Sequence, residues 1–113
     1  FDVLITNPPF AKSGKRYYRY FIDTLINDAH KLVKSGGRLI FIQSSMADKN
    51  RSISLMNEWG MKVRIVGETK GPFRDYYFED KLFMENIEKF PGAYEKKGDQ
   101  FIETLTVFEA VIP

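Results

Sequence analysis

Hydrophobic and polar positions change their period several times along the 113-residue chain, and each period predicts an element. The mostly apolar run at residues 1–6 (FDVLIT) is typical of a strand buried on both faces of a sheet. From residue 17 to about residue 34, apolar positions recur every three or four residues, which predicts one amphipathic helix ended by Ser35-Gly36-Gly37. Its apolar stripe comprises Tyr18, Phe21, Ile22, Leu25, Ile26, Ala29, Leu32 and Val33.

Three further strands follow in the sequence. Residues 38–43 (RLIFIQ) form a second apolar run, and residues 61–66 (MKVRIV) alternate between apolar and polar, which predicts a half-buried strand. Residues 103–112 (ETLTVFEAVI) are rich in β-branched side chains and predict a closing strand.

A loop and a short helix are expected between the second and third of these strands. The loop covers residues 44–50, and the helix covers about residues 51–59. Its apolar positions would bury Ile53, Met56 and Trp59 against the sheet.

Residues 71–101 have no clear period and contain many aromatic residues. About thirty residues are too many for a plain loop, so we interpret this segment as an insertion, with a possible helix only at about residues 78–90. It is either a lid or substrate-facing flap, or an aromatic mini-core packed on the sheet. The aromatic residues are Phe73, Tyr76, Tyr77, Phe78, Phe83, Phe90, Tyr94 and Phe101.

The order of these elements predicts an α/β fold. Strand–helix–strand alternation with short connections implies parallel pairing, and the last two strands can form an antiparallel closing pair. Ligands of such sheets bind beyond the carboxyl ends of the strands, and the segment Asn7-Pro8-Pro9-Phe10 directly follows the first strand.

This Asn-Pro-Pro-Phe segment offers a specific chemistry. The Asn7 side-chain oxygen and the Pro8 carbonyl are hydrogen-bond acceptors, and the two prolines restrict the backbone that carries them. Two acceptors that hold both hydrogens of a planar NH₂ group can turn the nitrogen lone pair toward an electrophile. The Phe10 ring supplies a face on which a planar group can stack. A rigid Pro-Pro turn beside a packed phenylalanine is the purely structural alternative.

Composition excludes several other classes of site. The absence of cysteine excludes disulfides and thiolate metal sites, and a single histidine makes a histidine metal cluster or a Ser-His-Asp triad improbable. The sequence contains neither a signal-peptide pattern nor an apolar run of the ~20 residues that span a bilayer. We therefore expect a cytoplasmic protein without a membrane partner.

Charge is distributed unevenly along the chain. Residues 1–70 carry twelve Lys and Arg against six Asp and Glu, whereas residues 71–113 carry five against nine. Four of the basic residues directly follow the Asn-Pro-Pro-Phe segment, where they favour a phosphate-bearing partner or simply form a solvated loop. They are Lys12, Lys15, Arg16 and Arg19.

Residues 1–10 resemble the catalytic motif of S-adenosylmethionine-dependent amino-methyltransferases. These enzymes methylate adenine or guanine amino groups in nucleic acid, or glutamine side chains in release factors. Residues 32–42 are similar to the next helix and strand of that family, and residues 101–110 resemble the final strand of its small HemK-like members. Residues 71–100 have no counterpart in this resemblance.

The resemblance implies the C-terminal half, about four strands, of a Rossmann-like class I methyltransferase domain. Asn7 and the Pro8 carbonyl would hold the target nitrogen, Phe10 would stack on the base or amide, and Pro9 would set the turn. Lys12, Lys15, Arg16 and Arg19 would then contact the substrate. The cofactor would be S-adenosylmethionine, with Asn7 at its site and the glycine-rich turn and acidic residue of that site expected upstream of residue 1.

The sequence is compatible with two kinds of methyl acceptor and with one non-enzymatic function. The basic and aromatic residues at 15–20 make nucleic acid the slightly favoured acceptor, whereas the HemK-like ending favours a protein glutamine. The alternative is a non-catalytic nucleic-acid-binding module, or a subunit that a partner completes. Because the cofactor-binding half has no counterpart here, we expect upstream residues, a second chain that supplies them, or loss of catalysis.

Overall fold

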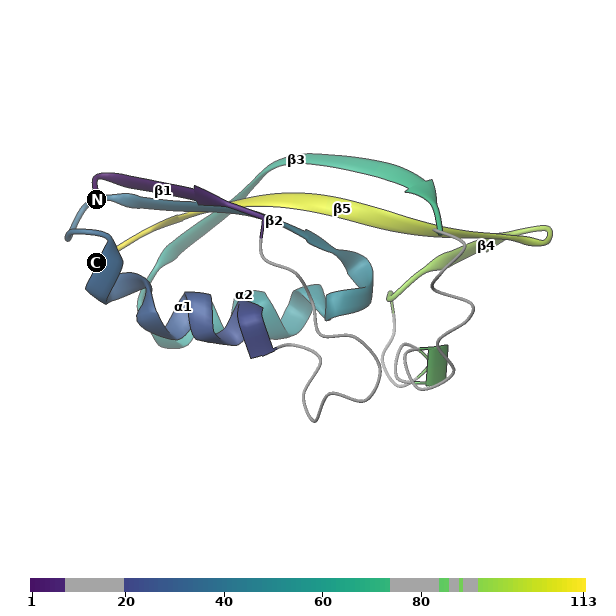
Figure 1. The fold of residues 1–113 in the computed structure, drawn as a ribbon, viewed down its shortest axis with the longest axis horizontal. Coiled ribbons are helices and arrows are strands. Elements are labelled where there is room, and N and C mark those ends of the chain that lie inside the picture. The colour runs from purple at the N-terminus through teal and green to yellow at the C-terminus, as the bar shows by residue number, and fades with distance from the viewer. Residues whose placement is uncertain (8–19, 74–83, 86–87, 89–91) are drawn as a thin grey trace.

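The computed structural model describes residues 1–7, 20–73, 84–85, 88 and 92–113, which form a five-stranded sheet with two helices on one face (Figure 1). This mixed α/β architecture agrees with the expected fold class. The elements are β1 Val3–Thr6, α1 Tyr20–Leu32, β2 Arg38–Ser44, the 3₁₀-helix η1 Ser45–Ala47, α2 Lys49–Glu58, β3 Lys62–Pro72, β4 Glu95–Lys97 and β5 Gln100–Val111.

The sheet has the strand order β1-β2-β5-β3, and the short β4 pairs with β5. β1 and β2 are parallel, with Thr6 opposite Phe41, whereas β5 is antiparallel to both of its long neighbours. The expected parallel first pair and antiparallel closing pair are therefore confirmed. β5 lies between β2 and β3, so these two strands share a direction without being neighbours.

β1 is less buried than its apolar sequence predicts. Leu4 packs against the core beside α1 and α2, but the alternating position Ile5 is 72% exposed. No described element covers the sheet face at Ile5 or pairs with the outer edge of β1. The expectation of burial on both faces is thus wrong for this part of the chain, because both helices pack on the opposite face.

The main core lies between the two helices and the middle of the sheet. The buried positions of α1 follow helical spacing, and they meet Leu39, Phe41, Phe108 and Ala110 of β2 and β5. Phe21 and Leu32, which the predicted stripe included, are exposed because they flank the narrower row that faces the sheet. That row comprises Ile22, Ile26 and Ala29 of α1 and Val33 directly after it.

The glycine pair after α1 ends the helix as expected. Gly36 has a φ of 83°, which favours glycine, and Gly37 lies where a Cβ would come within 2.6 Å of the Asp2 carbonyl oxygen. The Lys34 amide donates to Phe1 O at 3.0 Å, and the Arg38 amide donates to Asp2 O at 2.9 Å. The helix end and the start of β1 are therefore held closely together.

The segment expected as a loop at residues 44–50 is mostly helical. The buried turn η1 leads to Asp48, which has a φ of 58°. The Asp48 side chain caps α2 by accepting a hydrogen bond from the Arg51 amide. Met56 is buried as predicted, but Trp59 is exposed, because its ring stacks on His30 at the surface. Its indole Nε1 donates to Asn27 Oδ1 at 2.8 Å, which connects α2 to α1.

The third strand extends beyond the predicted residues 61–66, because β3 continues through an irregularity between Ile65 and Gly67 to Pro72. Beyond it, Phe73 and Ala93 join Met46 in a second small core. Tyr94 and Phe101 pack against this core, as the mini-core alternative predicts for these two aromatic residues. Most of the possible helix at residues 78–90 lies outside the described residues.

Candidate functional site

Asn7 directly follows β1, at the edge of the sheet where the parallel strands β1 and β2 have their carboxyl ends. Its side chain is exposed. Ligands of parallel sheets bind beyond this edge, so Asn7 lies where a substrate can reach it. The other residues predicted for the site lie outside the described residues: Pro8, Pro9, Phe10, Lys12, Lys15, Arg16 and Arg19.

Two serines at the carboxyl end of β2 fix the neighbouring part of this edge. The Ser44 hydroxyl donates to Glu103 at 2.7 Å and accepts from the Met46 amide at 3.2 Å. The Ser45 hydroxyl donates to Ala93 O at 2.6 Å and accepts from the Thr104 amide at 3.0 Å. Both buried hydroxyls are thus used twice, which connects β2 to β5 and to the segment before β4.

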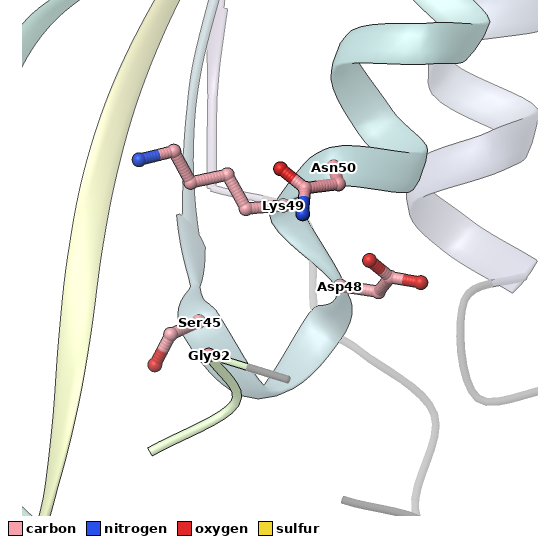
Figure 2. A pocket seen from close by; sticks show the side chains of 5 residues that line it. All are labelled: Ser45, Asp48, Lys49, Asn50 and Gly92. Atoms are coloured by element: carbon pink, nitrogen blue, oxygen red, sulfur yellow. The ribbon is translucent and has the colours of Figure 1, made fainter. Parts of the chain in front are cut away.

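A small polar cavity of about 210 Å³ lies at the same end of β2 (Figure 2). Figure 2 shows Ser45 and Gly92 close together at one side of the start of α2, where Asp48, Lys49 and Asn50 follow one another. The Lys49 ammonium pairs with Glu68 at 3.1 Å. Because ligand pockets begin at about 300 Å³, this cavity has room for one side chain or functional group.

A buried polar layer separates the apolar core from this edge. Gln43 of β2 is 3% exposed, and the fully buried Ser52 of α2 donates to its Oε1 at 2.5 Å. On the neighbouring strand, the buried Thr106 donates to Glu68 at 3.4 Å. Gln43 Nε2 has no hydrogen-bond partner among the described residues.

Sequence reasoning missed this layer and the paired serines. The available signal was the change from RLIFI to QSS within residues 38–45, because a glutamine on the face of Leu39 and Phe41 is unusual in a core strand. Strand alternation alone would have placed Gln43 on the buried face.

Two carboxyl groups, one in α1 and one in β5, have pKa values shifted in opposite directions. Burial raises the pKa of Asp23 in the first turn of α1, while the charge of Arg51 opposes that rise. At the opposite end of β2, the hydrogen bond from Arg64 lowers the pKa of the Glu109 carboxyl. The charge of Asp48, which lines the cavity, also raises the pKa of Asp23, whereas the Glu109 carboxyl pairs with arginines of β2 and β3.

Comparison with known proteins identifies the family of the chain. A family model described as the methyltransferase small domain matches residues 1–73, which run from β1 to just past β3. The chain belongs to the methyltransferase small domain family. The resemblance predicted from the sequence is thereby confirmed.

A relative of this methyltransferase small domain occurs in Methanocaldococcus jannaschii and is provisionally named a protein N5-glutamine methyltransferase. The two are 29% identical over 90 residues, which cover 66% of this chain and 46% of the relative. The chain thus spans about half the length of the relative that it matches.

The described part of the domain contains one of the predicted site residues and a set of polar groups beside it. Asn7, the serine pair, the small cavity and Gln43 all lie at or next to the carboxyl ends of β1 and β2. In this part of the chain, no helix is long and apolar enough to cross a membrane.

Proposed function

We propose that this domain transfers a methyl group from S-adenosylmethionine to the planar amide nitrogen of a protein glutamine. The observation that carries the proposal is the position of Asn7, immediately after β1 at the carboxyl edge and followed in sequence by Pro-Pro-Phe. Family membership and the name of the archaeal relative support the same reaction class.

The proposed chemistry needs hydrogen-bond acceptors that orient the target nitrogen, and it does not need a strong base. Asn7 Oδ1 and the Pro8 carbonyl would accept the two hydrogens of the target NH₂ group, which removes its lone pair from conjugation. The same acceptors would stabilise the positive charge that develops on the nitrogen. Pro9 would keep the turn rigid, and the Phe10 ring would stack on the planar group.

S-adenosylmethionine, when bound, supplies the electrophilic methyl group. The exposed Asn7 at the carboxyl edge fits a role beside this cofactor, since a polar side chain there is accessible to a ligand. We propose a Rossmann-like class I domain in which the rest of the cofactor site precedes residue 1. The unpaired edge of β1 would then pair with a preceding strand, and other preceding elements would cover the face at Ile5.

Protein glutamine is favoured over nucleic acid by the charges at the described edge. The cavity beside the site has Asp48 in its lining, and its one lysine is paired with Glu68. A phosphate backbone would require an excess of positive charge there. Nucleic acid remains the second candidate because Lys12, Lys15, Arg16 and Arg19 follow the Asn-Pro-Pro-Phe segment.

The test offers total protein, RNA and DNA in parallel to the full-length protein with methyl-labelled S-adenosylmethionine. We expect label in protein, at glutamine, and a loss of about 100-fold or more in transfer for Asn7→Ala. Asn57→Ala, on the exposed side of α2, is the matched control and should retain full transfer. Undiminished transfer by Asn7→Ala would refute the role of Asn7.

The identity of the labelled material decides between the candidates. Label in RNA or DNA alone would replace the glutamine proposal with the second candidate. Binding of nucleic acid without cofactor binding or any methyl transfer would instead indicate a non-catalytic module.

A further inference from the structure

We draw no further inference here: the strongest candidate, the polar cavity of about 210 Å³ between Ser45, Gly92 and the start of α2 (Figure 2), is formed largely by a helix N-terminus, and no second feature of the described residues points to a ligand there.

Discussion

The hydroxyl of Ser44, at the carboxyl end of β2, donates a 2.7 Å hydrogen bond to the buried carboxylate of Glu103 on β5. The same hydroxyl accepts from the Met46 amide and so begins the turn that leads to α2. One side chain therefore connects two strands and directs the chain away from the sheet. This connection lies at the same edge of the sheet as the candidate site.

Ser44→Ala should destabilise the full-length protein by about 1–3 kcal/mol, because the Glu103 carboxylate loses a buried donor. Ser44→Thr retains the hydroxyl and is the matched control, with a smaller expected loss. Chemical denaturation followed by circular dichroism measures both. Equal stability of Ser44→Ala and the wild type would show that Glu103 has sufficient partners without Ser44.

The sequence was sufficient to predict the features that depend on the spacing of apolar residues. The apolar row Ile22, Ile26, Ala29 and Val33 has helical spacing, and the buried strand at β2 is read directly from Leu39 and Phe41. A glycine in the left-handed region also ended α1 as expected. These features are local, so local sequence determines them.

Features that depend on contacts between distant residues could not be predicted. Ser45–Ala47 looked like a loop because its burial depends on partners 48 and 59 residues away, Ala93 and Thr104. Trp59 was expected in the core, yet His30 and Asn27 hold its ring at the surface. Asn7 was identified from its motif, whereas the unpaired donor of Gln43 became visible only with the packing of α2.

Gly37→Ala should destabilise the protein by about 1–3 kcal/mol through overpacking. A Cβ at this position would lie 2.6 Å from both Asp2 O and Val33 Cγ1, at the contact between the end of α1 and the start of β1. Gly71→Ala is the control, because its Cβ would meet nothing within 4 Å, and it should change stability by less than about 0.5 kcal/mol. Similar denaturation midpoints for the two variants would refute the close approach of Gly37 to Asp2 and Val33.

Glu109 should contribute to stability only where its carboxyl is ionised. Hydrogen bonds from Arg64 at 2.8 Å and Arg38 at 3.3 Å favour the charged form, and Arg64 has the largest effect in lowering the pKa of Glu109. The contribution is complete above the unfolded carboxyl pKa of about 4.3 and is lost as the pH falls through the lower folded value.

Glu109→Gln should therefore reduce the urea midpoint at pH 7, and its difference from the wild type should shrink below about pH 4. Glu58→Gln, on an exposed side chain at the end of α2, is the control and should match the wild type at both pH values. A Glu109→Gln loss that is equal at both pH values would indicate a packing role in place of the ion pairs.

The salt dependence of the acceptor KM should separate the two candidate acceptors. Four phosphate contacts by Lys12, Lys15, Arg16 and Arg19 would imply a loss of about 100-fold in nucleic-acid affinity between 50 and 200 mM salt. We expect the KM for a glutamine acceptor to change less than about threefold over this range, because a neutral amide releases few counterions. Replacing the four residues with Gln should likewise leave this KM nearly unchanged. A steep salt dependence that the fourfold variant abolishes would support a phosphate-bearing acceptor and contradict the glutamine proposal.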